Sequence, residues 1–369
     1  MVEWKKLDTL IDFQQPTSYL VKSTEYDDSY ATPVLTAGQS LLLGYTDEKE
    51  GIYKASKENP CIIFDDFTTS FHWIDFDFKV KSSAMKMLQP KENVNFRYVY
   101  YAMLGINYIP SGHQRHWISK YSQFEIPIPA LSEQIRIVGI LDTFTASIEN
   151  LKQQIAERRK QYEHYRNQLL DLEGKEGVEM KTLGDIMQIV RGASPRPIKN
   201  YITTKEEGVN WIKIGDVAPN AKYIHSTSEK INKEGAGKSR YLKAGDFILS
   251  NSMSFGRPYI LKIDGCIHDG WIAMSDFNGI VLPDYLYEYL NSNRVQKYWK
   301  MKANNGGAMT NLNSDIVRET PIIIPSLDEQ SRIVSILDTF EASIANLETQ
   351  LKEREKQYEY YRNKLLTFE

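Results

Sequence analysis

One segment of this chain occurs twice, and this repeat limits the possible folds more than any other feature. Residues 129–170 (PALSEQIRIVGILDTFTASIENLKQQIAERRKQYEHYRNQLL) align without a gap with residues 325–366 (PSLDEQSRIVSILDTFEASIANLETQLKEREKQYEYYRNKLL), and 29 of the 42 positions are identical. Each copy follows a segment of more than 120 residues, and those two segments are not obviously alike. Such a chain needs two different heads held in one fixed mutual geometry.

The repeated segment has the pattern of a coiled-coil helix. Apolar residues recur at alternating spacings of three and four over about four heptads, as the a and d positions of a coiled-coil seam do. The seam of the first copy comprises Leu141, Phe144, Ile148, Leu151, Ile155, Arg158, Tyr162, Tyr165 and Leu169. The seam of the second comprises Leu337, Phe340, Ile344, Leu347, Leu351, Arg354, Tyr358, Tyr361 and Leu365. A helix of about 38 residues, at a rise of 1.5 Å each, is roughly 57 Å long.

One arginine interrupts each seam at the same place, Arg158 in the first copy and Arg354 in the second. A charge at a buried position costs stability unless it is paired, so a polar seam residue more often fixes the register or the choice of partner. The alternative is that each arginine extends its guanidinium to the solvent at the rim of the seam. We predict a role in register for both residues.

The two copies can pair with each other within one chain. A polar segment with two glycines, residues 171–177 (DLEGKEG), follows the first copy, and residues 3–8 (EWKKLD) and 179–185 (EMKTLGD) open the two variable blocks in similar ways. We interpret the chain as beginning where a repeat unit begins and ending where one ends. This arrangement predicts an antiparallel coiled coil of two long helices that joins two globular α+β domains, with an approximate two-fold, circular repeat. The predicted parts are a first head (1–128), a central helix (129–172), a linker (173–178), a second head (179–324) and a C-terminal helix (325–369).

The first head contains a predicted strand and a predicted helix. Residues 73–80 (WIDFDFKV) alternate apolar and charged side chains, which indicates a half-buried strand. Residues 94–104 are predicted to be helical. A glycine-containing loop, a short helix and the apolar exit at residues 126–129 (IPIP) follow.

The second head has the same order of predicted elements. Residues 245–250 (GDFILS) and 257–263 (RPYILKI) predict strands, and residues 283–298 predict a helix with Pro283 near its first turn. A second glycine-containing loop and the exit at residues 322–325 (IIIP) follow. We therefore expect both heads to share one α+β fold with divergent surfaces.

Two loops in each head are rich in side chains that can read base edges. Arginine, glutamine and asparagine form specific hydrogen bonds in the major groove of DNA, whereas lone lysines mostly contact phosphate. The candidate residues of the first head are Thr68, Thr69, Phe71, His72, Ser111, His113, Gln114, Arg115 and Trp117. Those of the second head are Asn251, Ser252, Ser254, Arg257, Asn305, Met309, Thr310, Asn311 and Asn313. Solvated polar loops are the alternative interpretation.

Composition excludes several classes of protein. A net charge of −3 is not that of a simple DNA-coating protein, although residues 179–324 carry 19 Lys+Arg against 15 Asp+Glu. The two cysteines, Cys61 and Cys266, predict buried thiols rather than a disulfide framework or a zinc cluster. No apolar run of 18 residues and no signal peptide is present, so we expect a cytoplasmic protein without a membrane segment.

Signatures of catalysis and metal binding are missing from the sequence. It contains no GxGxxG, HExxH or GxSxG motif. His113 and His116 form one close pair, but no further ligands stand at metal-site spacing. We expect neither a catalytic residue nor a metal site in this chain.

The whole chain resembles the specificity subunit of type I restriction-modification enzymes. The resemblance rests on the two repeats, on the entry motifs IPIPALSEQ (126–134) and IIIPSLDEQ (322–330), and on GDFILS in the second head. The first head departs from this last pattern, because CIIFDDF (61–67) stands near the corresponding place.

The resemblance implies a DNA-recognition subunit without an activity of its own. Each head would be a target recognition domain that reads one half of a bipartite site in double-stranded DNA. The helix pair would set the gap between half-sites and dock two methyltransferase subunits, and two restriction motor-nuclease subunits would complete the complex. S-adenosylmethionine and ATP with Mg would bind the partner subunits, and no cofactor would bind this chain.

Two other functions compete with this one. The chain could be an adaptor whose heads bind proteins, in which case the loop residues would matter no more than other surface positions. It could also be a fused methyltransferase-specificity enzyme, against which the missing cofactor loop argues. Neither the half-sites, nor the spacer length, nor the helix faces that bind partners follow from the sequence, because readout depends on side-chain geometry and on DNA deformation.

Overall fold

The structure is a computed structural model that describes residues 2–36, 40–110, 112, 114–218, 221–251, 255–277, 279–303 and 311–368. The chain divides into two compact units. Unit 1 comprises residues 1–152 and 349–369, and unit 2 comprises residues 153–348. Each unit therefore contains one head and a part of both repeated helices.

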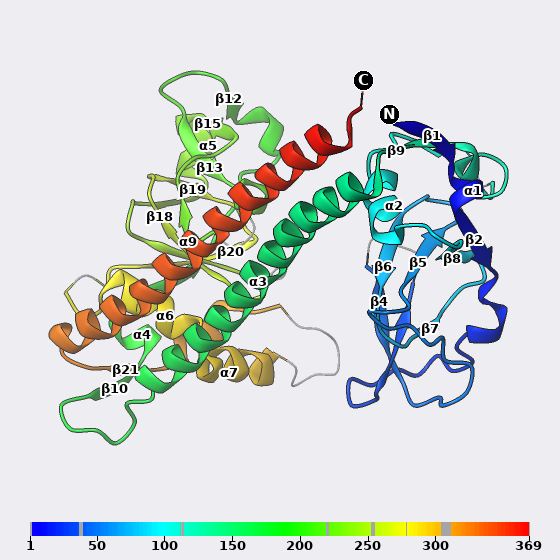
Figure 1. Ribbon diagram of the computed structural model, residues 1–369. Helices are drawn as coiled ribbons and strands as arrows, with labels where there is room; N and C mark the ends of the chain where they lie inside the picture. The colour runs from blue at the N-terminus through cyan, green and yellow to red at the C-terminus, as the bar shows by residue number, and fades with distance from the viewer. Residues whose placement is uncertain are drawn as a thin grey trace. The chain divides into compact units, whose positions relative to one another are not determined.

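Unit 1 contains the first head, whose strands form two main sheets and the two-stranded pair β1-β9 (Figure 1). Its elements are β1 (Glu3–Lys6), α1 (Leu7–Leu10), β2 (Ile11–Gln14), η1 (Pro16–Tyr19), β3 (Thr32–Leu35), β4 (Leu42–Thr46), β5 (Cys61–Asp65), β6 (Phe71–Ile74), β7 (Lys79–Val80), β8 (Met85–Pro90), α2 (Phe96–Met103), η2 (Tyr121–Gln123) and β9 (Glu125–Ile128). One sheet has the order β2-β8-β5-β6 and the other β4-β3-β7. Helix α2 buries Tyr98 and Tyr101 in one core with Ile62, Phe64 and Leu88 of the larger sheet.

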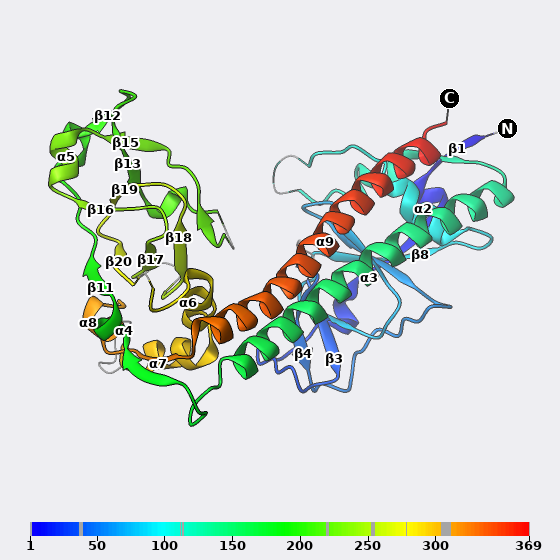
Figure 2. The ribbon, with the colours of Figure 1, turned by 90° about the vertical axis from the view of Figure 1, so that its left-hand side faces the viewer.

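Unit 2 contains the second head, which also has two main sheets (Figure 2). Its strands are β10 (Glu179–Thr182), β11 (Gln188–Arg191), β12 (Ile202–Thr203), β13 (Val209–Ile212), β14 (Tyr223–Ile224), β15 (Glu229–Ile231), β16 (Arg240–Leu242), β17 (Phe247–Ser250), β18 (Pro258–Leu261), β19 (Gly265–Ile267), β20 (Trp271–Ser275) and β21 (Pro321–Ile324). Its helices are α4 (Leu183–Ile186), η3 (Ile198–Asn200), η4 (Ile214–Asp216), α5 (Lys233–Gly237), α6 (Pro283–Leu290), α7 (Asn293–Ala303) and α8 (Ser314–Arg318). The sheet orders are β11-β20-β17-β18-β14 and β12-β15-β13-β19-β16.

The two heads share one fold, as the sequence predicted. The order β2-β8-β5-β6 in the first corresponds to β11-β20-β17-β18 in the second, and the helix that follows each sheet, α2 or α6, is fastened to the exit strand by a tyrosine. The Tyr98 hydroxyl donates to the Pro127 carbonyl at 2.7 Å, and the Tyr285 hydroxyl donates to the Ile323 carbonyl at 2.8 Å. Strand β5 contains the first part of CIIFDDF, so this segment takes the place of GDFILS in the first head.

The opening strand of each variable block pairs with the exit strand of the same block. Strands β1 and β9 are antiparallel with Glu3 opposite Ile128, and β10 and β21 are antiparallel with Glu179 opposite Ile324. Each exit then enters its long helix, α3 (Leu131–Leu169) or α9 (Leu327–Leu366). The similar openings in the sequence therefore have the same structural role.

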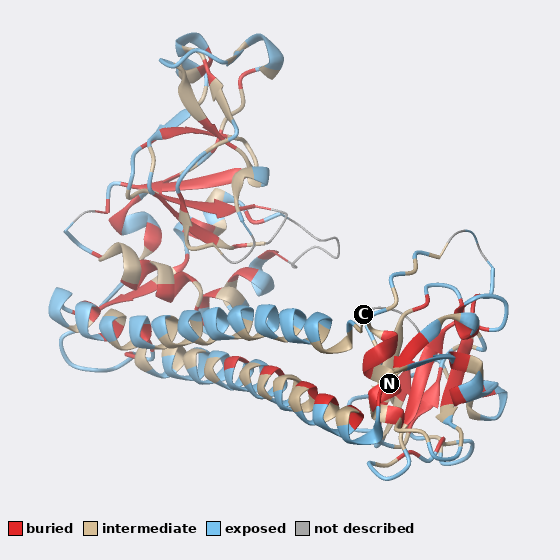
Figure 3. Ribbon diagram, turned by 45° about the horizontal axis from the view of Figure 1, so that its top comes forward, coloured by how far each residue is buried: buried red, intermediate tan, exposed pale blue. Residues whose placement is uncertain are grey.

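The two long helices pack against each other in opposite directions within both units. In unit 1, Tyr361 of α9 stacks on Phe144 of α3 with ring centroids 5.4 Å apart, and in unit 2 Tyr165 of α3 stacks on Phe340 of α9 at 5.2 Å. Position 361 corresponds to 165 in the repeat, and 144 to 340. Equivalent residues thus form equivalent contacts, as an antiparallel pair with an approximate two-fold repeat requires. Figure 3 shows that much of the outer surface of these helices is exposed.

Two predicted elements differ from the structure. The single strand predicted at residues 73–80 is wrong: β6 ends at Ile74 and pairs with β5, whereas β7 begins at Lys79 and pairs with β3 in the other sheet. The single helix predicted at 283–298 is also wrong, because α6 ends at Leu290 and α7 begins at Asn293. Ser292 accepts a hydrogen bond from the Val295 N–H there, so a new helix starts.

The buried thiols are confirmed. Cys61 and Cys266 are both free and buried, and burial raises the pKa of Cys61 to about 12. Among the described residues, no helix combines the length and the apolar character that a membrane crossing requires.

Candidate nucleic-acid interface

The predicted loops of the second head meet at one residue, Asn251, which directly follows β17. Its N–H donates to the Gly270 carbonyl at 3.2 Å, and its own carbonyl accepts from the Leu312 N–H at 2.9 Å. Asn251 therefore joins the segment that precedes α8 to the loop between β19 and β20. Asn251 and the segment at 311–313, which lie far apart in the sequence, therefore meet here.

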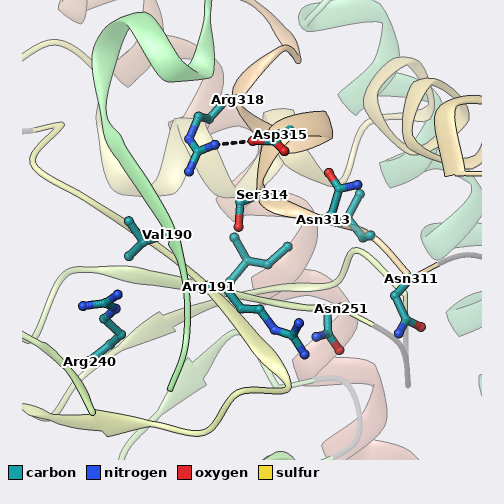
Figure 4. Close-up of a pocket in the computed structure, with 11 residues that line it drawn as sticks. Val190, Arg191, Arg240, Asn251, Asn311, Asn313, Ser314, Asp315 and Arg318 are labelled. Atoms are coloured by element: carbon teal, nitrogen blue, oxygen red, sulfur yellow. Dashed lines mark hydrogen bonds and ion pairs between the residues drawn. The ribbon is translucent and has the colours of Figure 1, made fainter. Parts of the chain in front are cut away.

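An open pocket of about 460 Å³ lies at this junction (Figure 4). It is lined by Val190, Arg191, Arg240, Asn251, Ile272, Asn311, Leu312, Asn313, Ser314, Asp315 and Arg318. Three arginines and three asparagines gather on one surface, while Arg318 is paired with Asp315. Such side chains supply the donors and acceptors that base edges and phosphates require.

The first head has the same junction with different residues. Asp66 directly follows β5; its N–H donates to the Ala84 carbonyl at 3.1 Å, and its carbonyl accepts from the His116 N–H at 2.8 Å. The Asp66 carboxylate also accepts from the Trp117 N–H at 2.7 Å. The Asp66 backbone thus forms the same two kinds of hydrogen bond as Asn251, so both heads position their two loops in the same way.

A buried ion pair stabilises the junction of the first head. The Lys86 ammonium on β8 lies 3.2 Å from the Asp66 carboxylate, and both side chains are 1% exposed. Removal of either partner would leave an uncompensated buried charge, which is strongly destabilising. These two residues therefore fix the position of the loops rather than contact a ligand.

The structure separates the predicted residues of the first head into exposed and buried ones. Thr68, Gln114 and Arg115 are exposed, and Phe71 and His72 are partly buried. Trp117, at 2% exposure, packs on Phe64 and Tyr121 in the core, and Thr69 is buried. We do not retain Trp117 or Thr69 as direct contacts, because neither offers its side chain to a ligand. Ser111 and His113 lie outside the described residues.

The predicted residues of the second head separate similarly. Asn311 and Asn313 are exposed, although the Asn313 side chain also caps α8 by accepting from the Ile316 N–H at 2.9 Å. Asn251 is buried, with its amide near the pocket, and the guanidinium of Arg257 lies over the Tyr259 ring. Ser252, Ser254, Asn305, Met309 and Thr310 lie outside the described residues.

The sequence interpretation missed three arginines of the pocket, Arg191, Arg240 and Arg318. Arg191 begins the segment RGASPRP, in which two arginines follow a strand within a glycine- and proline-containing loop of the only basic block. That pattern could have indicated Arg191. Arg240 and Arg318 offered no such signal, because only the fold brings them to the same pocket.

The seam arginines occupy equivalent positions. The Arg158 guanidinium lies 5.9 Å from the centroid of the Phe340 ring, and the Arg354 guanidinium lies 5.7 Å from that of Phe144. Both arginines are partly buried. Each therefore contacts the opposite helix through the face of an aromatic ring, where a cation is attracted to the ring electrons.

No cluster of three or more histidine, cysteine or carboxylate side chains suited to a metal ion occurs in the part of the chain that the structure describes.

Residues 1–158 and 175–356 match the family model of the type I restriction modification DNA specificity domain. This chain belongs to the type I restriction-modification specificity subunits. The specificity subunit of EcoR124I/EcoR124II from Escherichia coli is 39% identical over 393 residues, which cover 100% of this chain and 94% of that relative. A putative specificity subunit of Haemophilus influenzae, S.HindORF215P, is 32% identical over 390 residues, covering 100% of this chain and 96% of the relative.

Solved structures of specificity subunits have the same fold. The crystal structure of the S subunit of a type I restriction-modification system from M. genitalium superposes with a TM-score of 0.58 at 16% identity, covering 100% of this chain and 97% of that one. A chain from a study of complex assembly and conformational transition of the type I system gives 0.60 at 16% identity, with 99% and 96% covered. Family membership confirms the predicted role as a specificity subunit rather than a catalytic one.

Proposed function

We propose that each head reads one half of a bipartite site in double-stranded DNA. The observation that carries this proposal is the common junction of the two heads, Asp66 in the first and Asn251 in the second. One scaffold holds two loops in the same way, but the exposed side chains on the loops differ. Two different base sequences read by one framework require this combination of a shared backbone and divergent surfaces.

In the first head, the reading surface comprises the exposed predicted residues Thr68, Gln114 and Arg115 and the partly buried Phe71 and His72. In the second, it comprises Asn311, Asn313 and the arginines of the pocket. The second block carries a net charge of +4 (19 Lys+Arg minus 15 Asp+Glu), which favours contact with phosphate. The predicted parts, heads 1–128 and 179–324 and helical spacers 129–172 and 325–369, are the functional divisions that we propose.

The helix pair acts as the spacer between the half-sites. Its equivalent contacts, Phe144 with Tyr361 and Phe340 with Tyr165, support a fixed register, because one aromatic anchor recurs in each unit. A coiled coil with fixed register has a defined length for a given number of residues. The number of heptads would therefore set the gap between the half-sites.

The two long helices carry the same exposed face, once on each copy of the repeat. This repetition supports docking of two identical partners, one on each copy. The residues of this face, which we call the shared face, are Thr143, Ala146, Asn150, Gln154, Glu157 and Gln161 on α3, and Thr339, Ala342, Asn346, Gln350, Glu353 and Gln357 on α9. All twelve are exposed, and each residue is identical to its counterpart in the other copy. At about 100° per residue they fall within an arc of about 80°.

Exposed positions on the opposite side of each helix, which we call the diverged face, differ between the copies, for example Lys152 against Glu348 and Arg159 against Glu355. Burial does not explain identity at these exposed positions, whereas the same contact formed twice with a partner does. The occupants that we propose are two methyltransferase subunits, one on each copy. Two restriction motor-nuclease subunits would join this complex, and S-adenosylmethionine and ATP with Mg would bind to these partners.

Methylome sequencing tests the proposed function. A host that expresses this chain with its methyltransferase subunit is compared with the same host lacking this chain. We expect methylated adenines in a new two-part motif with a fixed non-specific gap. No new methylation, with the complex shown to assemble, would overturn the proposal.

Single substitutions then assign the half-sites to the heads. Arg115→Ala should change or weaken readout of one half-site only, and Asn311→Ala of the other only, because the two residues lie in different heads. Lys120→Ala, at another exposed position of the first head, is the control. If both variants leave both half-sites unchanged, the adaptor function is favoured instead.

A further inference from the structure

The loop His268–Gly270, between β19 and β20, forms hydrogen bonds with several segments of the second head that lie at the candidate interface. The Asp269 carbonyl accepts from the Arg191 Nε at 3.1 Å and from the Asn251 Nδ2 at 3.3 Å. These two donors come from the ends of two different strands, β11 and β17. One backbone oxygen therefore fixes two side chains that line the pocket (Figure 4).

The Asp269 carboxylate binds a third segment, which contains Ser194 and Arg196. The Ser194 hydroxyl donates to its Oδ1 at 2.9 Å, and the Arg196 guanidinium donates to its Oδ2 at 3.1 Å. The His268 Nδ1 accepts from the Gly270 N–H at 2.9 Å, which assigns the ring proton to Nε2, 3.1 Å from Oδ1. Burial acts to raise the pKa of Asp269, but the Ser194 hydrogen bond, His268 and Arg196 together hold this pKa below its usual value.

The segment that carries both arginines is pressed directly against this loop. A Cβ at Gly192 would lie 2.2 Å from the His268 carbonyl oxygen, so no larger residue fits there. The Gly192 N–H donates to the Trp271 carbonyl at 2.8 Å. The positions of Arg191 and Arg196 are thus set by the backbone of the loop as well as by the side chain of Asp269.

We propose that Asp269 is a positioning residue that presents Arg191 and Arg196 to the acceptor edge of a purine, such as the O6 and N7 of guanine, in the half-site of the second head. This inference rests on the proposed function. Arg191 uses Nε for the Asp269 carbonyl, which leaves the terminal nitrogens of its guanidinium for a bidentate contact. Arg196 is 81% exposed, so it too can reach a ligand.

Preorganisation is the reason that Asp269 affects readout. An exposed ion pair contributes little stability by itself. Here, however, Ser194 and His268 fix the carboxylate independently of Arg196. An arginine restrained in this way loses less side-chain entropy when it binds and accepts fewer alternative bases than a mobile one does.

The test uses the complete complex in the methylome experiment. Asp269→Asn, Arg196→Ala and the double variant are compared with wild type. Asp264→Asn is the matched control, because the Asp264 carboxylate also accepts hydrogen bonds in a loop of the same head, but from Ala244 and Tyr241 and not from an arginine. We expect Asp269→Asn to lower discrimination at one base pair of one half-site by about tenfold, with the other half-site unchanged. The double variant should lose no more discrimination than Arg196→Ala alone.

Two other outcomes would overturn the inference. One is unchanged base tolerance in the Asp269→Asn variant. The other is a uniform, salt-dependent loss of binding at every sequence, which indicates that the arginines contact phosphate instead. Thermal unfolding of each variant separates loss of folding from loss of readout, and Arg191→Ala provides a second variant that leaves Asp269 in place. Failure of the proposed function is distinguishable, because the wild-type complex would then give no two-part motif.

Discussion

Glu288 shows how a single residue fastens the second head to the long helices. It lies on α6 and is 2% exposed, and it accepts from the Tyr162 hydroxyl of α3 at 2.8 Å. The same hydroxyl contacts Glu341 of α9 at 3.0 Å, and Arg166 lies 3.9 Å from Glu288. Burial, opposed by the Tyr162 hydrogen bond, raises the pKa of Glu288 from 4.5 to about 7.

This raised pKa predicts a pH-dependent stability. Between pH 4.5 and about 7 the folded state retains a proton that the unfolded state has released, so the free energy of unfolding falls as the pH rises through this range. This group alone should lower the free energy of unfolding of the wild type by ~1–3 kcal/mol between pH 5 and pH 8. Glu288→Gln, whose side-chain oxygen can still accept from Tyr162, should not show this decrease. Denaturant unfolding at both pH values measures the difference. A parallel pH dependence in the variant and wild type would contradict it, and exposed Glu157→Gln is the control.

The long helices illustrate at the element scale what their sequence could predict. Their extent, direction and seam followed from the repeat, because a strict heptad pattern leaves few alternatives. The break between α6 and α7 was not predicted, since it depends on a capping contact at Ser292 that competes with a continuous helix. The split between β6 and β7 was missed because local alternation does not reveal which sheet a strand joins.

The candidate site could also be predicted from the sequence only in part. Polar loops identified Arg115 and Asn311, which are exposed, but composition cannot distinguish them from Trp117, which packs in the core. Nor could the sequence show Asp269, whose role depends on contacts with residues 18 to 78 positions away. Long-range pairing, not local pattern, decides these positions.

The seam arginines are expected to specify the register of the helix pair. Arg158→Leu together with Arg354→Leu should preserve helicity, because leucine is a good helix former, but permit slipped or intermolecular pairing. Circular dichroism measures helicity, and light scattering with size-exclusion chromatography measures mass. A strictly monomeric double variant with full activity would count against a role in register. Lys160→Leu with Lys356→Leu, at exposed equivalent positions, controls for added hydrophobicity.

At the scale of the whole molecule, the shared face predicts how many partners bind. Ala146→Arg with Ala342→Arg places a long charged side chain on both copies and should prevent assembly with the methyltransferase subunits. Ala146→Arg alone should leave one partner bound, so that the mass of the complex falls by one subunit. Ala156→Arg with Lys352→Arg, on the diverged face, should assemble normally. Unchanged masses for all variants would refute docking on this face.

The spacer function predicts a change in the DNA motif. Deletion of one heptad from each helix, residues 149–155 and 345–351, should bring the heads about 10 Å closer. The non-specific gap of the methylated motif should then shorten by about three base pairs at ~3.4 Å each. Deletion from only one helix disrupts the register and is the control for general damage. A gap of unchanged length in the double deletion would exclude the helix pair as the spacer.

The division of the chain into units has a consequence for protein synthesis. Tyr358, Leu365, Leu366 and Phe368 pack against the core of the first head, so unit 1 is incomplete until residues 349–368 have left the ribosome. The 196 residues of unit 2 are translated in between, which takes about 10–40 s at typical bacterial and eukaryotic rates. The head that is made first is therefore completed last. During that interval the apolar face of α3, which the end of α9 covers in the finished protein, stays exposed on the nascent chain.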